Sequence, residues 1–107
     1  MNIQEMMKQA QEMQQRMQEM QGKLADMEVQ GQSGGGMVSV IMTCRGEVRN
    51  VTIAPEVINP QDKETLEDLV MAAMNLAREN ADTTLADETK KMMGEMGLPT
   101  DMQIPGM

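Results

Sequence analysis

The chain has no phenylalanine, tryptophan or tyrosine among its 107 residues. Sixteen methionines stand where aromatic residues and some leucines would usually be found. Because methionine is unbranched and tolerates irregular gaps, a core built from it specifies side-chain geometry weakly. The chain also offers no ring on which an unpaired base could stack, which argues against recognition of single strands or RNA by stacking.

Histidine is absent as well, and cysteine occurs once, at Cys44. A single cysteine excludes an intramolecular disulfide framework, and without histidine it also excludes a Cys/His zinc cluster. Cys44 lies on the apolar face of a predicted strand, where we expect an inert core residue. We therefore predict no metal site and no cofactor, in a reducing cytoplasm.

Long apolar runs and positive charge are both scarce. No stretch approaches the ~18 apolar residues needed to span a membrane, and the N-terminus lacks the basic start of a secretory signal, so we expect no membrane partner. The net charge is −8, with −1 in residues 1–50 and −7 in residues 51–107. Since affinity for nucleic acid depends on Lys and Arg displacing counterions, any such role must be local.

A regular apolar seam defines the N-terminal segment. Its members recur at alternating spacings of three and four, which predicts one helix over residues 2–27, about 39 Å long. A seam this narrow requires a partner helix, either a second copy of itself or the C-terminal helix. The seam residues are Ile3, Met6, Ala10, Met13, Met17, Met20, Leu24 and Met27.

The hydrophobic period changes to two in the glycine-rich segment between Gly31 and Val40. A phosphate-binding loop would need a following Lys-Ser/Thr and a helix, whereas a strand pattern follows here. We therefore interpret the glycines as a structural turn. They are Gly31, Gly34, Gly35 and Gly36.

The rest of the chain predicts a meander and a second long helical segment. Residues 28–54 form three antiparallel strands, with Gly46-Glu47 as a two-residue type II′ turn. Asn59 is the predicted N-cap of a segment over residues 59–93, which is one helix or a pair broken at Asp82-Thr83-Thr84. Residues 94–107 are predicted as a loosely ordered tail or strap, which completes a single α+β domain over residues 1–107.

Several motifs in this order make the chain resemble the YbaB/EbfC family of bacterial nucleoid-associated proteins. The motifs are Gly31-x-Ser33-Gly34-Gly35-Gly36-x-Val38-x-Val40, Pro55-Glu56, Leu66-Glu67-Asp68-Leu69-Val70-x-Ala72-Ala73-x-Asn75-x-Ala77 and Ile104-Pro105-Gly106-Met107. The resemblance implies a tweezers-like homodimer whose sheets form the base and whose helices project as arms. It further implies double-stranded DNA as a partner, with little sequence preference, and a place in the nucleoid.

Basic residues on the two long helices are the candidate DNA contacts. Three of them, spaced eight and seven apart on the first helix, form a stripe about 22 Å long. Phosphate contacts of this kind position a protein without reading sequence. The alternative is that they only balance nearby glutamates, as in the i,i+4 pairs Glu12–Arg16 and Glu19–Lys23. The candidates are Lys8, Arg16, Lys23, Arg78, Lys90 and Lys91.

Other functions remain open at this point. The methionine stripe is typical of packing rather than of a Cu(I) site, but a Met-lined groove suits protein partners, as in a holdase-like dimer without DNA binding. A purely structural dimer within a recombination assembly is a further alternative. Adjacent carboxylates such as Glu67-Asp68 point to different helix faces, so we predict no enzymatic activity and no small-molecule substrate.

Overall fold

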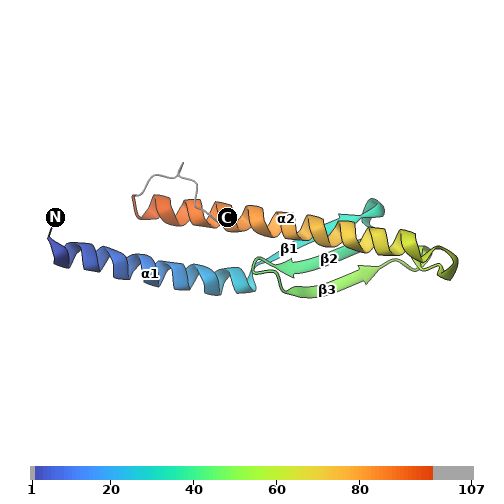
Figure 1. Ribbon diagram of the computed structural model, residues 1–107, viewed down its shortest axis with the longest axis horizontal. Coiled ribbons are helices and arrows are strands. Elements are labelled where there is room, and N and C mark those ends of the chain that lie inside the picture. Colours follow the sequence, from blue (N-terminus) through green and yellow to red (C-terminus); the bar gives the residue numbers. More distant parts are fainter. Residues whose placement is uncertain (1, 98–107) are drawn as a thin grey trace.

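The protein is elongated, with extents of 70 × 23 × 17 Å (Figure 1). A computed structural model describes residues 2–97, so most of the predicted tail, from residue 98 on, lies outside the described residues. The predicted α+β order of a long helix, a three-stranded antiparallel sheet and a second long helix is confirmed. The elements are α1 (Ile3–Asp26), β1 (Glu28–Ser33), β2 (Val38–Thr43), β3 (Val48–Ile53) and α2 (Lys63–Glu95).

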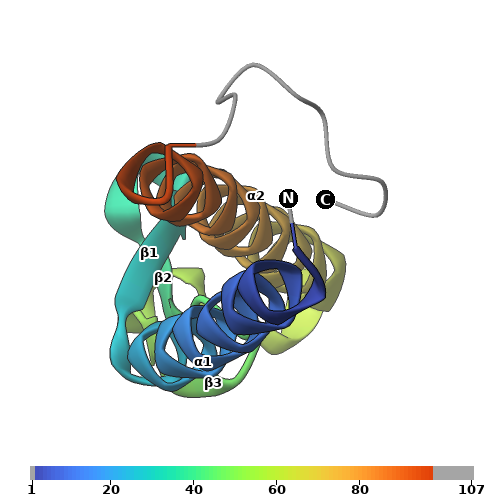
Figure 2. The same cartoon turned by 90° about the vertical axis from the view of Figure 1, so that its left-hand side faces the viewer.

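Helix α1 projects away from the sheet, and the C-terminal half of α2 runs back beside it (Figure 1). Figure 2, a view along the long axis, shows the two helices side by side in front of the sheet. Helix α1 begins at Asn2, whose side-chain oxygen accepts a hydrogen bond of 2.9 Å from the Glu5 backbone N–H and so caps the helix.

Within residues 2–97, the apolar seam of α1 is buried only near its C-terminal end. Met20 and Leu24 are buried against α2, whereas Ile3 is 74% exposed and Met17 is 43% exposed. The C-terminal helix is therefore the partner of the last turns, and the first turns present their seam to solvent. The first turns of α1 extend beyond the end of α2, so α2 cannot cover their seam (Figure 1).

The sheet has the order β1-β2-β3, and α2 packs across β1 and β2. Strand β2 supplies alternate buried side chains, as its sequence predicts, and α2 meets them with small residues that allow a close approach. The buried set is Val38, Val40, Met42, Ala73, Ala77 and Ala81.

The prediction that Gly31 is part of the turn is wrong. Gly31 lies within β1, and the chain reverses after that strand. A Cβ atom built on Gly31 would lie 2.2 Å from the Ala73 carbonyl oxygen and 2.3 Å from the Ala77 backbone nitrogen. The absence of a side chain therefore lets β1 lie directly against the backbone of α2. The reversal itself is a 3-10 turn over Gly34–Gly36, in which all three residues have positive φ.

The hairpin between β2 and β3 also differs from the prediction. The Gly46 N–H donates to the Thr43 carbonyl at 2.9 Å, and the Thr43 N–H donates to the Glu47 carbonyl at 2.8 Å. Gly46 has a φ of 94° and thus closes a three-residue loop in the left-handed conformation, instead of opening a two-residue type II′ turn. The loop carries Arg45 at its exposed tip.

Helix α2 is continuous over 33 residues and does not break at Asp82-Thr83-Thr84. The hydroxyl of Thr83 donates to the Glu79 carbonyl at 3.0 Å, and the neighbouring Ala81 is buried on the sheet, so packing outweighs weak helix propensity. Asn59 caps the start differently from the prediction. Its side chain accepts from the Gln61 N–H at 3.0 Å in a 3-10 turn, and α2 begins after that turn.

Candidate nucleic-acid interface

Helix α1 and the C-terminal half of α2 form a single arm held by a small methionine-rich core. Met20 and Leu24 of α1 are buried with Met92 and Met93 of α2, above Cys44. Burial raises the pKa of the Cys44 thiol, which fits a packing role. All six candidate cations lie on these two helices, and they extend from Lys8 near the tip of α1 to Arg78 where the arm joins the sheet.

Two of the candidate cations are engaged by carboxylates across the arm. The Arg16 Nη1 atom lies 3.2 Å from Glu95 Oε2, and the Lys23 Nζ atom lies 2.9 Å from Glu88 Oε2. The pairing therefore runs between the helices, and within the described residues Arg16 and Lys23 do not pair with Glu12 and Glu19 as the i,i+4 spacing predicted. The reason is geometric, because the side chains of α2 face α1 here and line a shared cavity of about 160 Å³.

The hydrogen bond from Lys23 lowers the pKa of Glu88, so this carboxylate is charged at neutral pH. Pairs of this kind in contact with water stabilise a protein weakly. A DNA phosphate would have to compete with Glu88 for the same ammonium group. Two of the three cations in the predicted stripe on α1, Arg16 and Lys23, are thus already paired with carboxylates of the same chain.

The other candidates are more available. Lys8, Lys90 and Lys91 are exposed and have no ion-pair partner among residues 2–97. Arg78 lies 3.4 Å from Asp82, but both side chains are more than 60% exposed. Lys8 lies near the tip of α1, which extends beyond the end of α2 (Figure 1).

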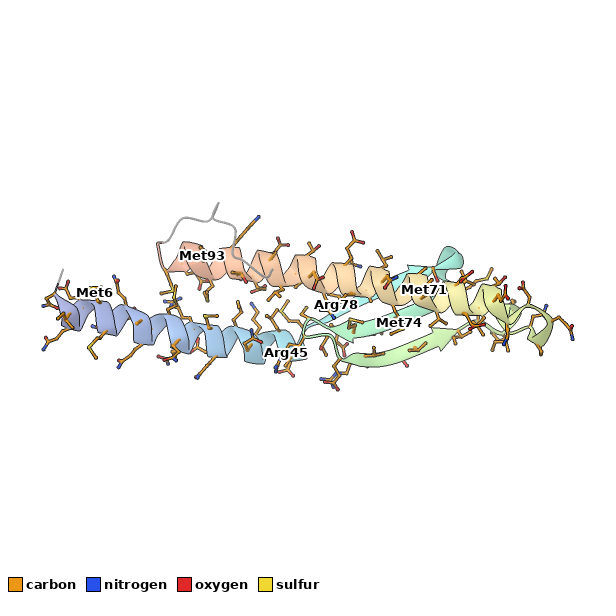
Figure 3. The ribbon with its side chains drawn as sticks, viewed as in Figure 1. Met6, Arg45, Met71, Met74, Arg78 and Met93 are labelled. Carbon is orange, nitrogen blue, oxygen red and sulfur yellow. The ribbon has the colours of Figure 1, made fainter. Side chains whose placement is uncertain are left out.

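Sequence reasoning missed three cations outside the predicted stripe. Arg45 is exposed at the hairpin tip, on the side of the sheet where the arm begins (Figure 3). Arg49 donates to the Ala25 carbonyl at 3.3 Å, and Lys63 is exposed at the start of α2. Arg45 could have been found from the sequence, because it stands immediately before the glycine of a predicted turn, where a side chain is usually exposed.

An apolar groove lies at the other end of the molecule, between β3 and the first half of α2. Its volume is about 550 Å³, and Ile53, Leu66 and Val70 line it together with Met71 and Met74. Both methionines are exposed on the first half of α2 (Figure 3). Helix α2 covers β1 and β2 but leaves β3 open, so the groove has no cover within the described chain.

The described residues contain no cluster of three or more His, Cys, Asp or Glu side chains able to hold a metal ion. None of the helices in the part of the chain that the structure describes is long and apolar enough to cross a membrane. The arm presents exposed ammonium and guanidinium donors beside exposed thioethers.

The fold and the arm define an elongated α+β protein with cations along a two-helix projection. The chain belongs to the YbaB/EbfC DNA-binding family, whose sequence model matches residues 1–96. It is 48% identical over 104 residues to a nucleoid-associated protein of Rhodospirillum centenum, covering 97% of each chain. It is 46% identical over 98 residues to a nucleoid-associated protein of Caldanaerobacter subterraneus, covering 92% of this chain and 88% of that one.

A solved structure has the same fold. The crystal structure of an uncharacterized protein from Helicobacter pylori matches with a TM-score of 0.76 at 24% identity, covering 87% of this chain and 98% of that one. The match to the family's sequence model confirms the family predicted from the Gly-rich and α2 motifs.

Proposed function

We propose that the protein is a nucleoid-associated, cytoplasmic protein that binds duplex DNA as a homodimer through its helical arms. Family membership and the names of the relatives support this proposal. The structural observation that carries it is the set of exposed cations on the arm that form no close ion pair with a carboxylate of residues 2–97: Lys8, Lys90 and Lys91. Their ammonium groups suit phosphates, which are the common feature of any duplex.

The character of binding follows from what the arm offers. Ammonium groups fix position on the backbone and carry no sequence information, so discrimination between sequences is small. The net charge of −8 repels DNA at long range, which keeps affinity low. The contacts of the cations with phosphates release counterions from the DNA, so affinity falls steeply with salt. Effects on nucleoid organisation, gene expression or recombination and repair would follow from this general coating or bridging of DNA.

The groove beside β3 supports the homodimer. Met71 is 58% exposed and Val51 of β3 is 44% exposed, so a sizeable apolar surface faces solvent in one protomer. A second copy placed over β3 would cover this surface and the open strand edge together. The two sheets would then form a base from which the arms of both copies project.

Duplex binding can be measured by fluorescence anisotropy of labelled DNA across ~50 to 200 mM salt. The triple variant Lys8→Gln, Lys90→Gln, Lys91→Gln should bind more weakly and with a shallower salt dependence than the wild type, because its neutral amides displace no counterions from the phosphates. Glu56→Gln serves as the control for solubility and folding. Binding by the wild type that is flat with salt, or unchanged in the triple variant, would overturn the arm as the DNA contact.

A second candidate function rests on the exposed methionines. A groove of about 450 Å³ between the tip of α1 and the end of α2 is lined by Met6, Ala10, Met13 and Met96. Flexible thioethers adapt to varied apolar segments, which suits a protein-interaction or holdase-like role. Suppression of aggregation of an unfolded test protein, by a wild type that binds no DNA, would favour this function over the first.

A further inference from the structure

A cleft with two arginines lies where the arm joins the sheet. Its volume is about 180 Å³, and Arg45 from the β2–β3 loop and Arg78 from α2 line it together with Gln21 of α1. Figure 3 shows Arg45 below the end of α1 and Arg78 on the neighbouring part of α2. Three elements far apart in sequence thus bring three side chains with N–H donors to one place.

The hairpin loop explains why the two arginines are neighbours. Gly46 closes the loop in the left-handed conformation, and a Cβ atom built there would lie 3.5 Å from Nη1 of Arg78. The guanidinium of Arg78 therefore lies against the loop backbone, one residue from Arg45. Glycine is favoured at this point by its φ of 94°, and a Cβ atom at 3.5 Å would be in ordinary van der Waals contact with Arg78.

The charges in the cleft do not balance. Arg45 has no ion-pair partner among residues 2–97, and the pair between Arg78 and Asp82 is a solvated contact of 3.4 Å. Two guanidinium groups thus meet one carboxylate at the cleft lining. Farther along the arm, by contrast, Arg16 and Lys23 each have a carboxylate of their own.

We propose that Arg45 and Arg78 form a phosphate-binding pair at the root of the arm, which holds a backbone phosphate of duplex DNA. The forked guanidinium group matches the oxygens of a phosphate and can donate two hydrogen bonds to them. The amide of Gln21 provides a further donor in the same cleft. This inference rests on the proposed DNA binding and adds where the duplex lies, against the root of the arm as well as along it.

The test uses the full chain. It compares three variants, Arg45→Gln, Arg78→Gln and the two combined, with the control variant Lys63→Gln. Lys63 is exposed at the N-terminal end of α2, outside the arm and the cleft. Lys63→Gln removes one positive charge, as each single variant does, and leaves both places unchanged. The slope of log affinity against log salt should fall by about one for each phosphate that a variant no longer binds, whereas Lys63→Gln should keep the wild-type slope. Far-UV circular dichroism verifies that each variant is folded.

A second readout reports the cleft directly. In a ¹⁵N NMR titration of the wild type with a short duplex, the Nε–Hε signals of Arg45 and Arg78 should shift, while that of Arg49 should not. Wild-type binding with a steep salt slope that Arg45→Gln and Arg78→Gln leave unchanged would overturn the cleft and leave DNA binding by the arm intact. A wild type that does not bind duplex DNA would overturn both.

Discussion

The ammonium group of Lys23 lies 2.9 Å from a carboxylate oxygen of Glu88, so a cation of α1 is held by α2. Arg16 and Glu95 repeat the arrangement nearer the tip, at 3.2 Å. These two pairs join the helices of the arm and at the same time occupy cations that could meet DNA. In the proposed binding mode, the acidic half of the chain therefore competes with DNA locally as well as through the net charge.

Removing the carboxylates should strengthen DNA binding. In Glu88→Gln with Glu95→Gln, Lys23 and Arg16 become free to bind phosphates, so affinity at low salt should rise and the salt slope should steepen by about one for each additional phosphate bound. Anisotropy titrations with labelled duplex measure both quantities. The matched control is Glu56→Gln with Glu64→Gln, which makes the same change of net charge far from the arm. Equal affinity of the two double variants would show that only net charge matters.

The ion pair between Lys23 and Glu88 predicts that the stability of the protein depends on pH. Because Lys23 lowers the pKa of Glu88 in the folded state, the pair stabilises the fold at pH values above the ordinary glutamate pKa of about 4.3. That contribution disappears as the pH falls through the lowered pKa. The difference in melting temperature between the wild type and Glu88→Gln should therefore be largest at neutral pH and vanish in strong acid. Melting curves by far-UV circular dichroism test this, and a difference that does not vary with pH would contradict it.

Gly31 and Gly22 should respond oppositely to alanine. Gly31→Ala places a Cβ atom within 2.2 to 2.9 Å of three backbone atoms of α2, so it should destabilise the protein by about 3 kcal/mol or more. Gly22 lies in the exposed interior of α1 with nothing within 4 Å, so Gly22→Ala should stabilise by about 0.5–1 kcal/mol. Urea unfolding followed by circular dichroism is the measurement, since the chain has no aromatic fluorophore. Similar stabilities for the two variants would contradict the close contact between β1 and α2.

The groove beside β3 predicts which substitutions separate a dimer. Met74→Asp would bury a charge against the second copy and should yield a monomer by size-exclusion chromatography with light scattering. Met7→Asp, on an exposed position outside the seam, should not change the mass. If Met13→Asp with Met17→Asp abolishes the dimer while Met74→Asp preserves it, the interface is the seam of α1 instead.

Much of the fold was accessible from local pattern. Alternation along residues 38–44 located β2 and its buried face, and Asn59-Pro60 marked the approach to α2. The β2–β3 turn was misassigned, because a single glycine after a polar residue is compatible with several loop lengths until the strand register is known. Gly31 was misassigned for a related reason, since its role is a contact with a helix more than forty residues away.

The features of the candidate site also fall into those that local sequence predicts and those that depend on the fold. The sequence by itself determined the seam, the two long helical segments and the cations on them, because helical periodicity and charge are local properties of the chain. Only the tertiary structure decided that Arg16 and Lys23 face carboxylates of α2 and that Arg45 lies beside Arg78. Those relationships depend on where α2 returns along α1 and on the loop closed by Gly46, and neither is encoded within any one segment.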